Sequence, residues 1–300
     1  MFFQGAITVA ILTGMTAGAF AAPQLAGEST NPSEATARGT ELESVTVEAR
    51  RRQERISKEV SEFVSAIVAS PMHESLGRWA VPVCPFTAGL ATSAGEFVRK
   101  RVAEVAAASG VPVGAPDCSP NFVVVVTPDP EKFLKDWWEA DHRLFNRERG
   151  VGGIMRFIEA DIPVRVWHNV CSAPPGLTRD FRLNITWDCN TGTLGSRLTY
   201  PAVRAIYLAI VMVHLTHIEG LTFGQVADHV AMVGLAQVRT SPDIAATPSI
   251  LSLFAEGGAD KPTGLTDWDQ SFLKAVYETR QGNVTEVSQI KMRMGRDLAK

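Results

Sequence analysis

The sequence predicts an α+β fold, in which helices pack on a single mixed β-sheet and residues 241–300 form a helical C-terminal part. Two runs rich in β-branched residues, 121–127 and 205–214, predict buried strands. Amphipathic stretches between and after them predict the helices. The chain has 300 residues, of which 45% are hydrophobic, so it can bury a substantial core. We find no internal repeat and expect one globular domain over residues 50–300.

The N-terminal residues are typical of a secretory signal peptide. Residues 1–21 carry no charged side chain, and the small residues Ala19 and Ala21 fit cleavage after Ala21. The alternative is a membrane anchor, but Gly14 and Gly18 interrupt the apolar run, which is shorter than the roughly 20 residues that a span requires. We therefore expect a periplasmic or secreted protein with no transmembrane segment in the mature chain.

A leader is expected to precede the globular domain. Residues 22–49 are rich in Ser, Thr, Gly and Glu, with little to bury, and predict a flexible segment. At its end, residues 43–52 read ESVTVEARRR, a short β-prone patch followed by arginines. This patch resembles the segment near the mature start of TonB-dependent outer-membrane receptors, which pairs with TonB by strand addition. We favour a linker that enters a basic helix, and an accessory role in TonB-dependent transport remains an alternative.

The first half of the domain is predicted to contain three helices. Residues 50–70 place Val60, Phe63 and Ile67 at helical spacing, which indicates an amphipathic helix. Residues 93–109 form a second such pattern, which Gly110 ends. A third helix is expected to start at Asp129, where an acceptor cap is followed by a proline and an acid.

The middle of the chain is predicted to add strands. The glycines of residues 150–153 predict a turn, because no phosphate-binding motif follows them. Residues 163–170 alternate in polarity, as a half-exposed strand does. Further strands are expected over residues 181–187 and 197–200.

The rest of the chain is organised around residues 205–236. A helix over residues 201–219 is one interpretation of its first part, because a proline begins it and Gly220 follows it. The crowding of Ile and Val over residues 205–214 favours a strand buried on both faces. After it, Thr222 is suited to cap a helix whose apolar face is made of small residues.

This strand, glycine link and helix resemble the part of the zincin metallopeptidases that presents their H-E-x-x-H-x-x-G helix, in which two histidines hold zinc and the glutamate activates water. Aligned on Gly234, the pattern places Ala227, Asp228 and Ala231 at the His, Glu and His positions. Alanine cannot bind a metal, so the resemblance implies a zincin-like fold that lacks this zinc site. Residues 248–277 look like the helical C-terminal part of exported zincin-like proteins, and the whole sequence is similar to exported bacterial proteins.

Four cysteines suit an oxidising compartment. No two of them lie two to four residues apart, as metal-binding pairs do, which favours structural disulfides. Four cysteines allow three pairings. Because short loops close most cheaply, we expect Cys84 to pair with Cys118 and Cys171 with Cys189.

One cluster in the sequence is suited to a metal. His214 and His217, with Asp228 or His229 downstream, form it, and His214, His217 and His229 are the alternative zinc set. Residues three apart on a strand point to opposite faces, so His214 and His217 can chelate only if the chain is helical or bends at Leu215. Histidine nitrogens that meet at one point would favour this alternative over a fold without a metal.

The C-terminal part is predicted to contain helices over residues 266–277 and 286–299, capped by Thr266 and Thr285. Asp267 and Asp269 flank Trp268 at the start of the first helix. They could act as an acid and base pair, but acids near the positive end of a helix stabilise it, and we favour that role.

Together these patterns predict an exported, non-catalytic, zincin-like binding or envelope-associated protein without a cofactor. The alternative is a metal-dependent hydrolase that uses His214, His217 and a third ligand, with zinc as its cofactor. A formal net charge of -3 argues against a nucleic-acid groove. An envelope protein would suit the expected location as a partner.

Overall fold

The computed structural model describes residues 32–69, 75–145, 150–173, 203–240, 242–244, 247–255 and 261–300. Residues Ala49–Lys300 form one compact unit, distinct from the residues before them. Met1 to Ala21, predicted as a signal peptide, and the strands predicted over residues 181–187 and 197–200 lie outside the described residues. Within the described part of the chain, no helix has the length and apolar character needed to cross a membrane.

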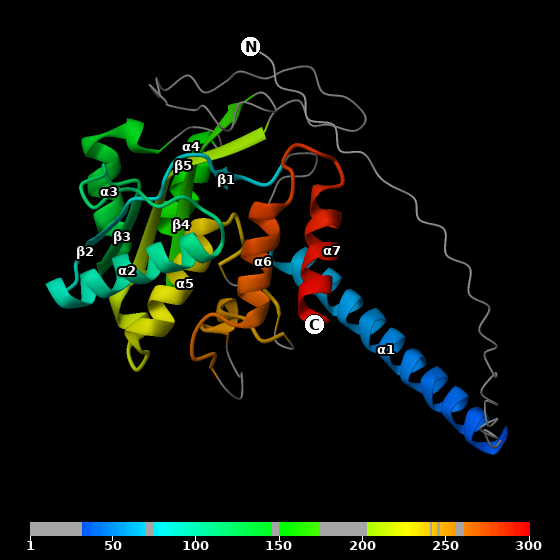
Figure 1. Ribbon diagram of the computed structural model, residues 1–300. Coiled ribbons are helices and arrows are strands. Elements are labelled where there is room, and N and C mark those ends of the chain that lie inside the picture. Colours follow the sequence, from blue (N-terminus) through cyan, green and yellow to red (C-terminus); the bar gives the residue numbers. More distant parts are fainter. Residues whose placement is uncertain are drawn as a thin grey trace, which may run out of the picture. The chain divides into compact units, whose positions relative to one another are not determined.

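The five described strands form one mixed, mostly parallel sheet, which confirms the predicted α+β fold (Figure 1). Strand β5 pairs with β1 and β3 in parallel and with β4 in the antiparallel direction, while β2 pairs with β3 in parallel. The strands are β1 (Arg78–Trp79), β2 (Pro85–Ala88), β3 (Phe122–Thr127), β4 (Val164–Ala173) and β5 (Val203–His214).

Residues 205–214 lie in strand β5, as the strand interpretation predicted, and β5 is the centre of the sheet. Strand β4 runs along one edge of β5 over its whole described length. Since a strand has only two edges, β1 and β3 must share the other edge, where β1 pairs at Ala205 and Ile206 and β3 pairs from Ala209 to His214. Residues of β5 face two hydrophobic cores in alternation, with Val211 in one and Ile210 in the other. The strand is therefore buried on both faces.

Helices cover both faces of the sheet. Helices α2 and α5 pack on the first face, where the larger core also includes side chains of α1, α6 and α7, and the smaller core lies between the other face and α3 and α4. Helices α2 and α5 lie side by side on the first face (Figure 1). The α-helices are α1 (Pro32–Ile67), α2 (Thr92–Ala108), α3 (Pro130–Ala140), α4 (Gly150–Glu159), α5 (Phe223–Leu235), α6 (Asp267–Glu278) and α7 (Glu286–Leu298), and the 3-10 helices are η1 (His142–Leu144), η4 (Leu215–Ile218) and η5 (Ile250–Ser252).

Several helix predictions are confirmed. Val60, Phe63 and Ile67 are buried on α1. Helix α2 ends just before Gly110, which has a φ of 83°. The Asp129 side chain caps α3 by accepting a hydrogen bond from the Lys132 amide. The C-terminal part contains η5, α6 and α7 and no strand among its described residues, so its helical character is also confirmed.

Two local predictions are wrong. The glycines predicted as a turn at residues 150–153 begin α4, because Ile154, Phe157 and Ile158 bury one helical face in the smaller core. Strand β4 is not half-exposed: Arg165 and His168 are buried with their apolar neighbours, since helices cover both faces of the sheet. Nη1 of Arg165 donates to the Phe157 and Ile158 carbonyls at the end of α4, while its buried Nε has no hydrogen-bond partner within the described structure.

The start of the first helix also differs from the prediction. Helix α1 begins at Pro32, inside the segment 22–49 that was predicted to be flexible. Proline is accommodated in the first turn of a helix because its missing amide would have no partner there. Residues 43–52 lie within this helix, so they would have to unwind before they could pair with TonB as a strand.

One predicted disulfide is present. Cys84, just before β2, is bonded to Cys118, just before β3. The bond joins the entries of two neighbouring parallel strands. Cys171 in β4 is also disulfide-bonded, and its expected partner, Cys189, lies outside the described residues.

A buried ion pair ties the sheet to the C-terminal helices. Arg78 in β1 donates to a carboxylate oxygen of Glu286, the first residue of α7. A second nitrogen of the same guanidinium donates to the Thr279 carbonyl at the end of α6. The Arg78 and Glu286 side chains are only 8% and 2% exposed, so both charges lie away from solvent.

Candidate functional site

Helix α5 is built as the sequence predicts, but its motif positions face the protein interior. Thr222 and Gln225 form a reciprocal capping box at its start. Ala227 and Ala231, the positions that correspond to zinc ligands in the zincin pattern, are fully buried in the larger core. They therefore pack against neighbouring residues and line no open cleft.

Asp228, at the position of the zincin glutamate, has a structural role. Its carboxylate accepts two hydrogen bonds from Arg101 of α2 and one from the Leu265 amide. These contacts occupy both oxygens and join α5 to α2 and to the segment before α6. The hydrogen bond between Arg101 and Asp228 holds the pKa of the Arg101 guanidinium above its usual value, although burial acts in the opposite direction. Asp228 is thus committed to an ion pair.

Gly234 allows α5 to approach the sheet closely. A Cβ at this position would lie 2.2 Å from the Phe122 ring, which is fully buried and stacks on Trp79. The Gly234 carbonyl accepts a hydrogen bond from Trp79 Nε1 and lies 3.1 Å from His168 Nε2. The glycine is therefore required by packing.

We expect Gly234→Ala to destabilise the protein by about 1–3 kcal/mol, because the added methyl overpacks a core that cannot yield. The measurement is the free energy of unfolding in urea. Gly224→Ala on the same helix is the matched control, since its Cβ would meet only Thr222 Oγ1, at 3.7 Å. Equal stability of the two variants would contradict the packing role.

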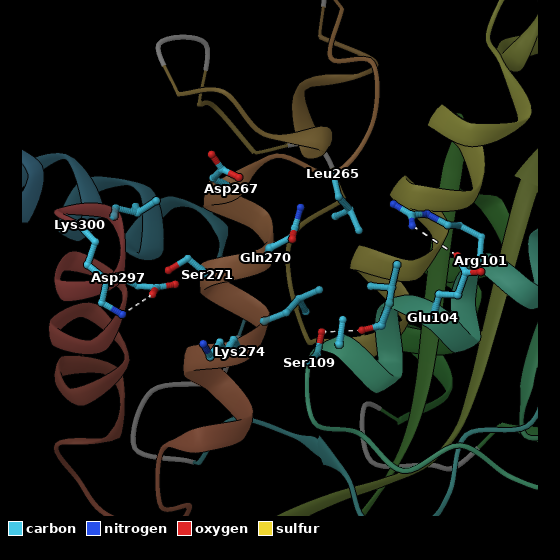
Figure 2. A pocket seen from close by; sticks show the side chains of 14 residues that line it. Arg101, Glu104, Ser109, Leu265, Asp267, Gln270, Ser271, Lys274, Asp297 and Lys300 are labelled. Carbon is cyan, nitrogen blue, oxygen red and sulfur yellow. Dashed lines mark hydrogen bonds and ion pairs between the residues drawn. The ribbon is translucent and has the colours of Figure 1, made fainter.

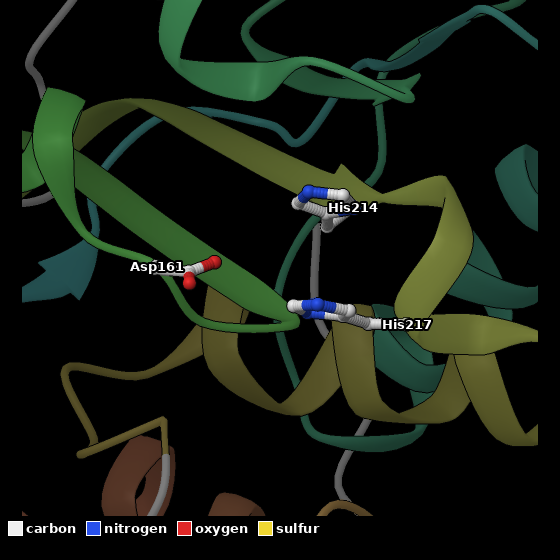
Figure 3. Close-up of side chains that lie close together, drawn as sticks. All are labelled: Asp161, His214 and His217. Atoms are coloured by element: carbon white, nitrogen blue, oxygen red, sulfur yellow. The ribbon is translucent and has the colours of Figure 1, made fainter.

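A group of possible metal ligands lies at the carboxyl end of β5. Ligand atoms of Asp161, His214 and His217 all lie within 4.8 Å of one another. His214 is the last residue of β5, and η4 begins at the next residue, so the chain bends at Leu215, as chelation requires. Asp161 lies just before β4, whose antiparallel pairing with β5 brings it to the same end of the sheet. Figure 3 shows its carboxylate facing the two imidazole rings.

The third member of this group differs from the predicted one. Asp161, and not His229, lies with His214 and His217. Asp161 and His217 are exposed and His214 is half-buried, so the group opens to solvent. Two imidazoles and one carboxylate are a ligand set suited to zinc, iron or other divalent transition metals.

The two histidine rings are stacked, with centroids 4.2 Å apart and planes 12° from parallel. Burial and the neighbouring His217 lower the pKa of His214, which favours its neutral form. The Thr216 hydroxyl lies 2.9 Å from His214 Nδ1. Because an imidazole lone pair lies in the ring plane, a shared metal must lie in both planes. At least one of the two stacked rings must therefore rotate when a metal binds.

His229 has a different environment. It is fully buried on α5 and packs edge-on against Phe254, with ring centroids 4.9 Å apart. Within the described structure, neither ring nitrogen has a hydrogen-bond partner. Burial lowers the pKa of His229 to about 4, and the nearby Thr240 backbone raises it by a smaller amount. His229 is therefore a neutral core residue.

The Asp267 and Asp269 pair does not form an acid and base site. Asp269 is buried, where its carboxylate accepts hydrogen bonds from the Ser249 hydroxyl and the Ile250 amide and completes the capping box of Thr266. Burial raises the pKa of Asp269. Asp269 therefore helps to cap α6, and Asp267 lies in the same first turn.

A cavity of about 640 Å³ lies between α2, α6 and α7. Figure 2 shows Arg101 and Glu104 on its α2 side, and Gln270 and Lys274 along α6. Arg101 is held by Asp228, and Lys300 pairs with Asp297. Asp161, His214 and His217 do not line this cavity.

Comparisons with protein-family models, with curated proteins and with solved structures find no match to this chain. The geometry of the described residues therefore carries the functional argument, and the zincin-like resemblance stays a prediction. Sequence reasoning identified His214 and His217 but missed Asp161. The sequence shows Asp161 only as an acid shortly before a strand. This position points to the metal site only once that strand is known to pair with β5.

Proposed function

We propose that this protein binds a divalent transition metal ion, with zinc as the first candidate, through Asp161, His214 and His217. The observation that carries the proposal is the convergence of the three ligand atoms within 4.8 Å. The same geometry supports the alternative predicted from the sequence, in which His214, His217 and a third ligand hold a metal.

The surroundings suit such a site. The three residues come from the carboxyl end of β5, from η4 and from the segment before β4, and small molecules commonly bind at the carboxyl ends of parallel strands. The described cysteines are all in disulfides, so no thiolate among them competes for the metal. The disulfide and the predicted signal peptide support an exported protein, in which the metal would be taken from outside the cytoplasm.

We expect the chelator-treated protein to bind one equivalent of zinc, and His217→Ala to lose this binding, because removing one of three ligands leaves too few. The measurement is a calorimetric titration with zinc chloride. His142→Ala is the matched control, since His142 is exposed but lies outside the group, against Trp138. Zinc binding that survives in His217→Ala as it does in His142→Ala would contradict the proposal.

Metal-dependent hydrolysis is a second candidate. Three protein ligands leave at least one zinc position for water, as in catalytic zinc sites, and the exposure of Asp161 and His217 leaves that position open to solvent. A bound water of lowered pKa would be the nucleophile. Cleavage of a chromogenic peptide by the zinc-loaded protein, lost in Asp161→Asn, would support this activity. Stoichiometric zinc binding without cleavage would contradict the hydrolytic activity and leave metal binding as the function.

A further inference from the structure

A histidine that binds a metal needs its lone pair on the nitrogen that faces the ion. The neutral imidazole carries one hydrogen, on either Nδ1 or Nε2, and the hydrogen bond made by one nitrogen decides which of them is free to bind. Metal-binding histidines almost always donate their other N–H to a fixed acceptor. This inference therefore rests on the proposed function and asks what fixes the imidazole of His214.

The structure places a hydroxyl group next to one ring nitrogen of His214. Thr216 Oγ1 lies 2.9 Å from His214 Nδ1. A threonine hydroxyl can accept a hydrogen bond from an N–H while it donates its own hydrogen elsewhere. With Nδ1 engaged in this way, Nε2 is the nitrogen of His214 that remains for a metal.

The backbone makes this contact possible. Strand β5 ends at His214 because η4 starts at Leu215, and Thr216 is the second residue of that 3-10 turn. The amide of His214 donates to the Pro163 carbonyl, which joins the end of β5 to the segment that carries Asp161. The His214 ring, the Thr216 hydroxyl and the Asp161 carboxylate therefore lie at one corner of the sheet, where this backbone hydrogen bond holds the two segments together.

We propose that Thr216 is a positioning residue of the metal site, which accepts a hydrogen bond from Nδ1 of His214 and so presents Nε2 to the ion. Thr216 does not touch the metal. It holds the ring in the tautomer and orientation that allow binding.

The first test is the zinc affinity of two variants of the full chain. Thr216→Val keeps the shape of the side chain but removes the hydroxyl, and we expect it to bind zinc about 10–100-fold more weakly, the usual effect of losing such a partner. Thr216→Ser retains the hydroxyl and is expected to keep wild-type affinity. Thr216 is exposed, so both variants should unfold at the wild-type temperature.

The second test uses the metal-free protein and ¹⁵N NMR of the imidazole nitrogens. We expect the hydrogen of His214 on Nδ1 in the wild type and in Thr216→Ser, and a shift toward the other tautomer in Thr216→Val. A merely structural role of Thr216 would not move this signature.

The outcomes separate this inference from the proposed function. If the wild type binds no zinc, the metal site is wrong and the role of Thr216 falls with it. If the wild type binds zinc but Thr216→Val binds equally well, only the positioning role is overturned. A His214 hydrogen found on Nε2 in the metal-free wild type would overturn it as well.

Discussion

Glu286→Ala is expected to lower the free energy of unfolding by about 3–5 kcal/mol, because it leaves the buried charge of Arg78 without its partner. Burial is the largest influence on both groups: it lowers the pKa of Arg78 and raises the pKa of Glu286 in spite of their attraction. The expected loss therefore measures the cost of an unpaired charge in the interior. The measurement is equilibrium unfolding in urea.

Two further variants make this prediction specific. Glu278→Ala removes the exposed partner of Arg293, which also joins α6 to α7, and should cost no more than about 1 kcal/mol. The double variant Arg78→Met and Glu286→Leu replaces both charges with apolar groups and should recover most of the stability lost in Glu286→Ala. If the double variant is less stable than Glu286→Ala, the ion pair stabilises the folded protein by more than offsetting the cost of burying its two charges.

Acidification is expected to destabilise the protein by up to about 3 kcal/mol through His229 alone, since one pKa unit corresponds to about 1.36 kcal/mol. The pKa of His229 falls from 6.5 in a free chain to about 4 in the folded protein. Between these values the unfolded chain binds a proton that the folded chain does not. Stability is therefore complete above about pH 6.5 and is lost as the pH falls toward 4.

The measurement is the free energy of unfolding at a series of pH values. His229→Leu fills the same site with an apolar side chain, so its stability should depend less on pH across this window. It should also be no less stable than the wild type at pH 7, because it removes two buried nitrogens without partners. His142→Ala, at an exposed site, should keep the wild-type pH dependence. Identical curves for His229→Leu and the wild type would contradict the buried, neutral state of His229.

Local patterns in the sequence were sufficient to predict the elements that depend on local rules. Residues 205–214 form a strand because β-branched side chains suit a doubly buried position, and the caps at Thr222, Asp129 and Thr266 act within three residues of themselves. The pair of Cys84 with Cys118 also followed from a sequence argument, that of loop length.

The remaining features depend on contacts between distant residues. Glycines usually end helices, yet α4 forms through residues 150–153 because Ile154 and Phe157 find a core to fill. Asp161 joins His214 and His217 only through the antiparallel pairing of β4 with β5. The packing of Ala227 and Ala231 in the interior likewise depends on where α5 lies.

The central position of β5 also has a consequence for synthesis. The ribosome delivers β1, β2, β3 and β4 before β5, and three of these strands pair with it directly. Until residue 214 has emerged, β3 and β4 keep an edge of unsatisfied amides and carbonyls, which are templates for intermolecular pairing. We therefore expect chains that stop before Val203 to aggregate, and the sheet to assemble late and in one cooperative step.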